Sequence, residues 1–440
     1  MKYTIALCSL GCAKNLVDSE RMLAILKNHN YKIIADFTAA DVIVVNTCGF
    51  IESAKEESIE TILEYAALKN NKCKVLVVTG CLVQKYQKDL AVEIPEVDLW
   101  LGTLNFTEIG EKLDELLPNT AQIIEYDDLC HRELTTPNHW AYLKIAEGCD
   151  NTCTFCVIPQ MRGPYKSRTI ENIIEELRVL ISKGVKEVIV LAQDTTVYGK
   201  DIYGKPYLKE LLKAMVKEDI FWIRILYSYP QRMDGELLEL ISREEKICTY
   251  LDIPMQHSED GVLKAMGRPE RKDKLIKLLK QIRTINADFV IRSTFIVGFP
   301  GETQEDFMGL CEFLQEAKLD WVGVFPYSKE EDTVAGAMPN QIPEDIKEYR
   351  YNYIMSLLTR YSAHNLEKWQ NKTILVIIEG KLDVNDEYSK GYQYVARASF
   401  QAPDVDGMVY VKTNKSHNPG DAIKVTVVST DIYDLMGEEI

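Results

Sequence analysis

The 440-residue sequence lacks any apolar run near the roughly 18–20 residues that a membrane-spanning helix needs, so we expect no integral membrane protein. Its first residues lead directly into a strand-like pattern, without an apolar signal segment, so we expect a cytoplasmic protein. Basic residues are also scarce, with 51 Lys and Arg against 67 Asp and Glu, a net charge of −16. Because non-specific affinity for nucleic acids comes mainly from Lys and Arg, this balance argues against a broad phosphate-binding surface.

The sequence shows no internal repeat, no low-complexity tract and no metal-ligand spacing among its six histidines. Its 46% hydrophobic and 27% charged residues are typical of a globular protein, and its length suggests two to four domains. The eleven cysteines are an odd number without a secretion signal, which disfavours a disulfide scaffold and favours metal or redox use.

Three domains are predicted from the pattern of strands and helices. In residues 1–125, apolar β-branched runs at 4–10, 41–46 and 74–79 alternate with helical patterns at 17–28 and 52–69. Runs of this kind fit parallel strands that are buried on both faces, so we expect an α/β domain with a mostly parallel sheet. Turn-forming residues at Pro118, Asn119 and 135–138 mark the linker that follows.

Residues 135–369 contain six strand-like runs separated mostly by amphipathic helices, such as 170–183 and 272–285. The runs are at 142–146, 187–192, 222–227, 250–253, 289–296 and 321–326. Six βα units predict a partial (β/α)6 barrel, and an open doubly wound sheet is the alternative. A long polar helix is expected at 343–369. Residues 370–438 then contain short strands at 374–378, 392–400, 408–411 and 422–428 without helices between them, which predicts a small antiparallel β-barrel.

Cys149, Cys153 and Cys156 form a C-x3-C-x2-C loop just after the first predicted barrel strand, where barrel active sites are built. Three thiolates on one loop can hold three irons of a cubane cluster and leave the fourth iron open for reaction. The alternatives are a zinc site with a distant fourth ligand, or chance clustering.

Cys12, Cys48 and Cys81 each stand at the carboxyl end of one of the three N-terminal strands, and each is next to a glycine. In a parallel sheet the carboxyl ends of the strands form the ligand crevice, and glycine lets the backbone turn sharply and approach a cofactor. We therefore expect these thiols to converge on one edge of the sheet and to hold a second cluster, with chance placement as the alternative. The other cysteines, at 8, 73, 130, 248 and 311, are expected to be core residues.

Polar residues also follow or lie on predicted barrel strands. Gln193 and Gln256 follow the second and fourth strands, and Arg292 lies on the fifth. Such groups could bind a cofactor's amino, carboxylate, ribose or adenine groups, although each could also cap a helix. His257 lies at a strand end as well, and a structural histidine is the expected role.

The cysteine loop on a six-unit barrel resembles the radical S-adenosylmethionine superfamily. Together with Cys12, Cys48 and Cys81 and a C-terminal barrel similar to a TRAM domain, the likeness extends over the whole chain to the methylthiotransferases. Within that family the chain resembles the RimO-type enzymes more than the tRNA-modifying MiaB-type enzymes. The stretches that carry this likeness are SLGCAKNLVDSE at 9–20, YLDIPMQH at 250–257 and VFPYS at 324–328, and the tRNA enzymes usually have Gln-Met in place of Ala13-Lys14.

The resemblance implies two 4Fe-4S clusters, one on Cys149, Cys153 and Cys156 that binds S-adenosylmethionine, and an auxiliary one on the N-terminal triad that carries sulfide or polysulfide. No catalytic residues beyond these cysteines are implied, and Gln193, Gln256 and Arg292 become candidates for contacting S-adenosylmethionine. The implied reaction is transfer of a methylthio group to the β-carbon of an aspartate in ribosomal protein S-twelve, free or in the small ribosomal subunit. The implied electron donor is of the flavodoxin or ferredoxin type.

The alternatives are a tRNA methylthiotransferase, a two-cluster electron carrier without a substrate, and a zinc-binding scaffold. Charge disfavours tRNA, because residues 371–440 carry 7 Lys and Arg against 11 Asp and Glu, and residues 1–140 carry 13 against 21. An acidic C-terminal barrel suits a basic ribosomal protein. We expect its docking acids near predicted turns, at Asp383, Asp386, Glu387, Asp404 and Asp406.

Overall fold

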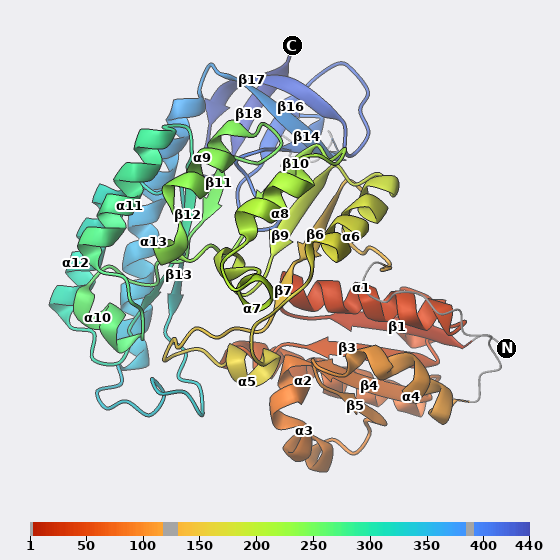
Figure 1. Ribbon diagram of the computed structural model, residues 1–440. Helices are drawn as coiled ribbons and strands as arrows, with labels where there is room; N and C mark the ends of the chain where they lie inside the picture. The colour runs from red at the N-terminus through yellow and green to blue at the C-terminus, as the bar shows by residue number, and fades with distance from the viewer. Residues whose placement is uncertain (1–2, 118–130, 384–390) are drawn as a thin grey trace. The chain divides into compact units, whose positions relative to one another are not determined.

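The computed structural model describes residues 3–117, 131–383 and 391–440 (Figure 1). Some predictions fall outside these residues: the linker at Pro118 and Asn119, the end of the first domain at 125, and the roles of Cys130, Asp386 and Glu387. The chain forms two compact units, one of residues 1–136, 142–179 and 328–336, the other of residues 137–141, 180–327 and 337–440. Within the described ranges, no helix combines the length and apolar character that crossing a bilayer requires.

The first unit is built on a parallel sheet with the strand order β2-β1-β3-β4-β5. Its three main strands are β1 (Thr4–Ser9), β3 (Val42–Thr47) and β4 (Val75–Gly80), close to the predicted runs. Every residue of β3 and β4 is buried, as the continuous apolar runs predict. The edge strands β2 (Lys32–Ile33) and β5 (Leu99–Leu101) were not predicted, because two or three residues are too few to show a periodicity.

Helices cover both faces of this sheet, which explains why its strands are apolar throughout. Residues of α1 (Ala13–Asn28) and α4 (Ile109–Leu116) pack with Ile5, Val44 and Val77 on one face. On the other face, residues of α2 (Glu52–Ala67) and α3 (Cys81–Glu93) pack with Ala6, Val45 and Val78. Neighbouring residues of one strand thus enter different cores, as the two-residue period of a strand requires. The predicted α/β domain with a parallel sheet is confirmed.

All six predicted central strands are present. They are β6 (Trp140–Lys144), β9 (Glu187–Leu191), β10 (Trp222–Ile225), β11 (Tyr250–Asp252), β12 (Val290–Val297) and β13 (Trp321–Pro326). They form two sheets, β10-β9-β6 and β11-β12-β13, and a parallel bridge joins Ile223 of β10 to Ile247 just before β11. Spatial order therefore follows chain order. A doubly wound sheet would reverse its strand order at a switch point, so the partial barrel is the correct prediction.

Helices separate these strands in the chain. The longer ones are α6 (Ile170–Ser182), α8 (Leu208–Met215), α9 (Gly235–Arg243), α11 (Lys272–Ile285) and α12 (Gln304–Ala317), with the shorter α7 (Lys200–Tyr203) and α10 (Asp260–Ala265). A small hairpin of β7 (Ala146–Glu147) and β8 (Lys166–Ser167) encloses the cysteine loop and α5 (Ile158–Arg162).

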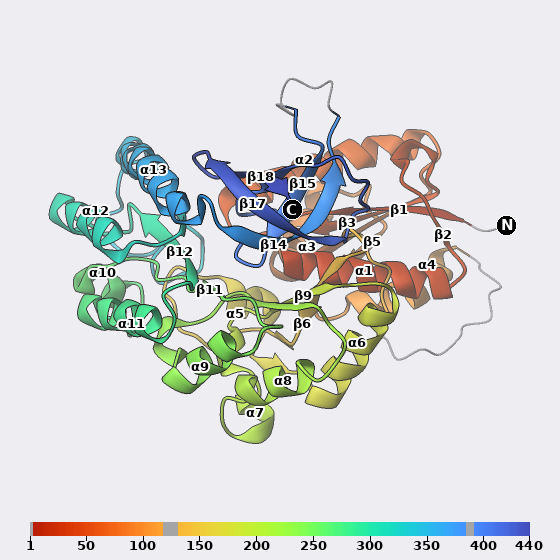
Figure 2. The ribbon, with the colours of Figure 1, turned by 90° about the horizontal axis from the view of Figure 1, so that it is seen from above.

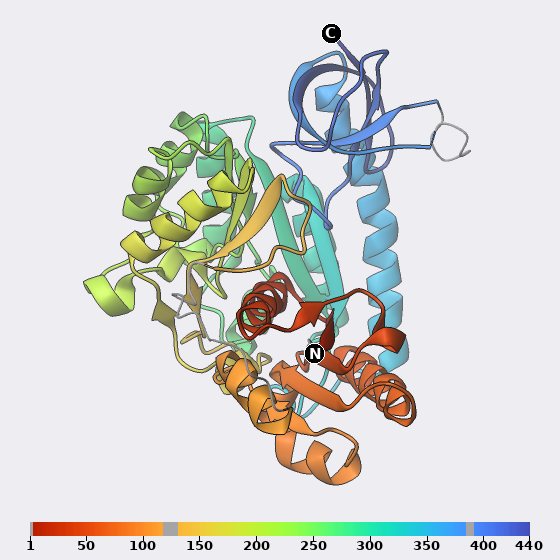
Figure 3. The same cartoon turned by 90° about the vertical axis from the view of Figure 1, so that its right-hand side faces the viewer.

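The second unit ends in a closed barrel of five short strands with the order β14-β15-β16-β18-β17 (Figure 2). The strands are β14 (Thr373–Lys381), β15 (Tyr394–Ala398), β16 (Val409–Lys412), β17 (Ala422–Thr430) and β18 (Leu435–Glu439). The long helix α13 (Glu344–Leu366) leads into this barrel (Figure 3). The predicted small barrel is confirmed, with two corrections: β18 was missed because its end is acidic rather than apolar, and β16 and β18 pair in parallel.

Buried charges join the closed barrel to the central strands of the same unit. Glu187, the first residue of β9, accepts from Arg224 of β10 at 2.7 Å and from Arg397 of β15 at 2.6 Å. Arg397 also pairs with Glu379 of β14 at 2.9 Å, and Glu379 binds His139 at 2.9 Å. Burial raises the pKa of Glu187, but the two arginines outweigh it and lower the pKa below its usual value. Glu187 is therefore ionised, and its charge is paired with the two arginines.

Candidate functional site

The N-terminal cysteines lie where three neighbouring strands end. In the parallel register Ser9 of β1 pairs with Asn46 of β3, and Thr47 of β3 pairs with Gly80 of β4. The chain therefore leaves all three strands at the same edge of the sheet. Cys12 directly precedes α1, Cys48 directly follows β3, and Cys81 is the first residue of α3. The three cysteines therefore lie at one edge of the sheet, as predicted, and a shared cluster there stays a prediction.

Two glycines permit this close approach of the strand ends. Gly11 has a φ of +85°, and a Cβ there would lie 2.7 Å from Cys48 Cβ and 3.0 Å from Cys48 Sγ. Gly80 has a φ of +103°, and a Cβ there would lie 2.4 Å from the Thr47 carbonyl oxygen. Only glycine fits both the left-handed backbone and the space.

The motif at 9–20 binds the strand ends together. Asn15 donates from Nδ2 to the carbonyl oxygens of Leu10 at 3.0 Å and Thr47 at 2.9 Å, the residues that follow β1 and end β3. Ser19 Oγ donates to Ser9 Oγ at 2.8 Å. The polar side chains of α1 therefore point into the protein because the backbone groups at the sheet edge need partners.

The second triad lies on a tight loop between β7 and α5 of the same unit. The amide of Cys149 donates to the carbonyl of Gly163 at 3.1 Å, and the amide of Cys156 donates to the carbonyl of Cys153 at 3.2 Å. These bonds close the loop that carries all three cysteines.

The thiols differ in their ionisation. The positive charges of Lys14 and Arg162 and the backbone amides of Lys14 and Asn15 hold the pKa of Cys12 below its usual value. Burial raises the pKa of Cys81 to about 11 and that of Cys156 to about 12. A bound metal deprotonates its thiol ligands outright, so a raised pKa does not prevent Cys81 or Cys156 from serving as a ligand.

The donor atoms of both triads are thiols. Across residues 3–117, 131–383 and 391–440, no three His, Cys, Asp or Glu side chains are close enough to share one metal ion. Iron–sulfur clusters are held by thiolates on separate irons, so their ligands need not meet at one point. All-thiol donor sets at two places in one unit fit such clusters.

A segment remote in sequence contacts α2 and α3 of the N-terminal sheet and the loop of the second triad. Residues 328–336 belong to the first unit, and Glu330 pairs there with Lys55 of α2 at 3.0 Å with both side chains nearly buried. Asp332 pairs with Lys85 of α3 at 3.5 Å, and the amide of Ala335 donates to the carbonyl of Thr154, between Cys153 and Cys156, at 2.9 Å. Sequence reasoning missed this segment, because its signal is only a polar stretch just after the motif at 324–328.

The candidate S-adenosylmethionine contacts lie in the second unit. Gln193 follows the carboxyl end of β9. Gln256 follows β11 with a φ of 71°, and its backbone exchanges hydrogen bonds with Thr294 and Ile296 of β12, each at 2.8 Å. Arg292 lies instead near the amino end of β12, where Nη1 pairs with Asp252 at 3.1 Å and Nε lies 3.7 Å from Asp406. For all three residues the contact stays a prediction.

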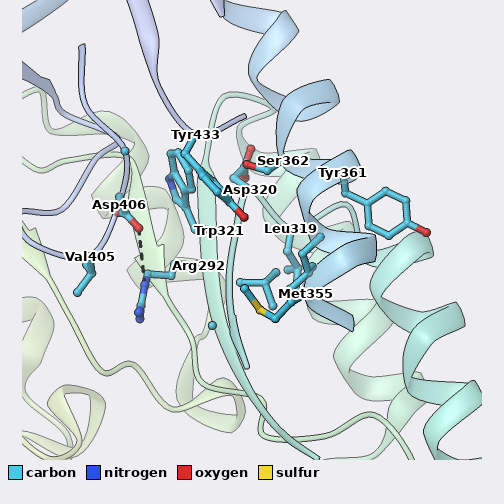
Figure 4. A pocket seen from close by; sticks show the side chains of 14 residues that line it. Arg292, Leu319, Asp320, Trp321, Met355, Tyr361, Ser362, Val405, Asp406 and Tyr433 are labelled. Carbon is cyan, nitrogen blue, oxygen red and sulfur yellow. Dashed lines mark ion pairs between the residues drawn. The ribbon is translucent and has the colours of Figure 1, made fainter. Parts of the chain in front are cut away.

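Arg292 and Asp406 line a cavity of about 420 Å³ whose walls come from β13, α13 and the closed barrel (Figure 4). Asp406 was predicted to be an exposed docking acid, and this is wrong. Its side chain is fully buried and accepts from the Tyr250 hydroxyl at 2.6 Å and the Ala402 amide at 2.8 Å. Asp383 and Asp404 are exposed, as predicted. Asp favours turns for local hydrogen bonding, and here one such residue turns inward to a tyrosine instead.

His257 and Glu302 lie beyond the carboxyl ends of β11 and β12. His257 is fully buried, its Nδ1 accepts from the Glu259 amide at 3.1 Å, and burial lowers its pKa to about 3. His257 is therefore uncharged at neutral pH, and its structural role stays a prediction. Burial also raises the pKa of Glu302 to about 7, although Arg350, 2.8 Å from its Oε1, and the Phe299 amide oppose the rise.

Glu302 should therefore make the protein less stable as the pH rises. Its folded pKa of about 7 lies above its ordinary 4.5, so its contribution is complete below pH 4.5 and is lost as the pH passes 7. The full contribution of Glu302 to the free energy of unfolding is about 3 kcal/mol. Glu302→Gln should flatten this part of the pH profile of urea unfolding, whereas Glu344→Gln, at a side chain 85% exposed, should not. An unchanged profile in Glu302→Gln would contradict the raised pKa.

Three family models match successive parts of the chain. Residues 4–102 match "Uncharacterized protein family UPF0004", residues 143–314 match the Radical SAM superfamily, and residues 372–440 match the TRAM domain. Two solved structures share the fold at low sequence identity. The radical S-adenosylmethionine methyltransferase TsrM from Kitasatospora setae has a TM-score of 0.58 and 13% identity, covering 76% of this chain and 77% of that one. The cobalamin-dependent S-adenosylmethionine radical enzyme OxsB has a TM-score of 0.50 and 12% identity, covering 80% and 56%.

Curated relatives match along nearly the full chain. A protein of Clostridioides difficile is 45% identical over 99% of this chain and 98% of its own length, and one of Clostridium botulinum is 47% identical over 99% and 98%. A third, from Thermoanaerobacter, is 46% identical over 99% of both. Each is named "Ribosomal protein uS12 methylthiotransferase RimO".

Proposed function

The chain belongs to the RimO family of ribosomal protein uS12 methylthiotransferases, and we propose that it is itself a radical S-adenosylmethionine enzyme that methylthiolates uS12. We further propose that the target is the β-carbon of an aspartate of that protein. The observation that carries the proposal is the full-length similarity, to which the all-thiol triads in the first unit add independent support.

Two sets of residues would hold the cofactors. Cys149, Cys153 and Cys156 would hold a 4Fe-4S cluster with one iron left for S-adenosylmethionine, and Cys12, Cys48 and Cys81 would hold an auxiliary cluster. When bound, these groups supply a radical that abstracts hydrogen from an unactivated C–H bond, together with the sulfur for insertion, as sulfide or polysulfide.

The protein's own groups would position these cofactors. The left-handed Gly11 and Gly80 bring the strand-end thiols together, and the positive charges of Lys14 and Arg162 favour the thiolate of Cys12. Gln193 and Gln256, at the carboxyl ends of barrel strands, are our proposed contacts to S-adenosylmethionine. Arg292 is a third proposed contact, and it is held by Asp252.

The chain's charge supports a basic protein as substrate rather than tRNA. Residues 371–440 carry a net charge of −4, and Asp383 and Asp404 remain exposed there. Opposite charges would speed the encounter with a Lys- and Arg-rich ribosomal protein, free or in the small subunit. A cytoplasmic location and a flavodoxin or ferredoxin as electron donor complete the proposal.

The proposed function is tested by anaerobic incubation of the reconstituted protein with S-adenosylmethionine, reductant and sulfide. Purified uS12, small ribosomal subunits and tRNA are supplied in separate reactions. We expect mass spectrometry to find one methylthio group on an aspartate of uS12 and none on tRNA nucleosides. A methylthiolated tRNA with unmodified uS12 would overturn the assignment, and deoxyadenosine formation in all reactions controls for cluster loading.

A further inference from the structure

Arg162 follows the second cysteine triad in the chain, and its side chain contacts residues of the N-terminal triad and of α1. It is the last residue of α5, a helix that begins two residues after Cys156. Its side chain is only 2% exposed, which is unusual for arginine unless its charge is matched. All its contacts described below lie within the first unit.

One guanidinium group contacts both the thiol and the helix of the N-terminal triad. Its Nε donates to Cys81 Sγ at 3.3 Å, and its Nη2 donates to Asn15 Oδ1. Asn15 in turn binds the carbonyl of Thr47, the residue directly before Cys48. Arg162 is six residues after Cys156. This short segment therefore connects the second triad to Cys81 and to Asn15, which binds the backbone next to Cys48.

Carboxylates hold the guanidinium in this orientation. Its Nη1 pairs with Asp18 at 2.6 Å and with Glu147 at 3.1 Å. Lys144 pairs with the same two carboxylates, at 2.7 Å from Glu147. Two cations and two anions therefore balance in a largely buried cluster, and the Nε–H of Arg162 is directed at sulfur. A buried, fully paired guanidinium has a rigid position.

Hydrogen bonds to the sulfur ligands of an iron–sulfur cluster, and positive charge beside it, favour the reduced form and raise the reduction potential. We propose that Arg162 is a positioning residue that sets the reduction potential of the cluster held by Cys12, Cys48 and Cys81, through its bond to Cys81. The inference rests on the proposed function, because it requires that cluster.

The test uses the full-length protein with Cys149, Cys153 and Cys156 replaced by Ala, so that one cluster remains. Its midpoint potential is measured by redox titration with electron paramagnetic resonance. Adding Arg162→Met should shift the potential to a more negative value, because the N–H···S bond and the charge are both lost. Arg162→Lys should give a smaller shift, because it keeps the charge but not the planar fork.

Arg132 offers a matched control. It is as deeply buried as Arg162, but it pairs with the carboxylates of Glu20 at 3.1 Å and Glu176 at 2.9 Å. Arg132→Met should lower thermal stability and leave the potential unchanged. An equal shift in Arg132→Met, or an unchanged potential in both Arg162 variants, would overturn the proposal. If the protein with Arg162→Met holds no iron, the midpoint potential of the protein with Arg162→Lys decides the test. Absence of iron from the parent triple variant would instead count against the auxiliary cluster of the proposed function.

Discussion

Replacing Cys149, Cys153 and Cys156 together by Ala is expected to remove about half of the iron of the reconstituted protein, roughly four of eight atoms. The same variant should form no deoxyadenosine, because the proposed S-adenosylmethionine site depends on that cluster. Replacing Cys12, Cys48 and Cys81 should remove the other half of the iron and leave cleavage of S-adenosylmethionine intact, while methylthiolation of uS12 is lost. Iron analysis and chromatography of the reaction products measure both effects.

Cys311 provides a control for the chemistry of cysteine replacement. It is 6% exposed, lies on α12 in the second unit, and burial raises its pKa to about 11. Cys311→Ala should keep the full iron content and both activities. Full iron content in the Cys12, Cys48 and Cys81 variant would show that the strand-end thiols do not hold a cluster.

Replacing Arg397 by Met is expected to cost about 3–5 kcal/mol of unfolding free energy, because it leaves buried carboxylates without a cation. Arg397 is fully buried and pairs with Glu187 at 2.6 Å and Glu379 at 2.9 Å. These pairs join the closed barrel to the central strands of the second unit. Urea unfolding, followed by far-ultraviolet circular dichroism, measures the loss, and limited proteolysis should release residues of the closed barrel first.

An exposed ion pair of the same barrel is the matched control. Lys412 and Glu438 are 3.5 Å apart, with side chains 62% and 54% exposed. Since water screens such pairs, Lys412→Met should change the stability by no more than about 0.5 kcal/mol. Equal effects of the two substitutions would mean that the buried cluster around Glu187 does not stabilise the second unit.

Local sequence was sufficient to predict the structure where a residue's environment follows from its near neighbours in the chain. The apolar runs of β3 and β4 predicted strands buried on both faces, and the helices on the two faces confirm it. Sharp turns were expected at the glycines beside all three strand-end cysteines, and Gly11 and Gly80 have a positive φ whereas Gly49 does not. Edge strands of two or three residues were not predicted, because their pairing depends on a neighbouring strand rather than on their own pattern.

The sequence by itself determined that the N-terminal sheet is parallel, that there are six central strands, and where the two sets of cysteines lie relative to the strands, because hydrophobic period and residue spacing are local properties. Only the tertiary structure decided which distant charges meet. It turned Asp406 inward to Tyr250, paired Arg397 with Glu187, and placed Arg162 on Cys81. A charged residue has the same local signal in solvent and in the interior. Whether it is buried depends on a partner that can lie more than a hundred residues away, and burial without that partner is too costly to persist.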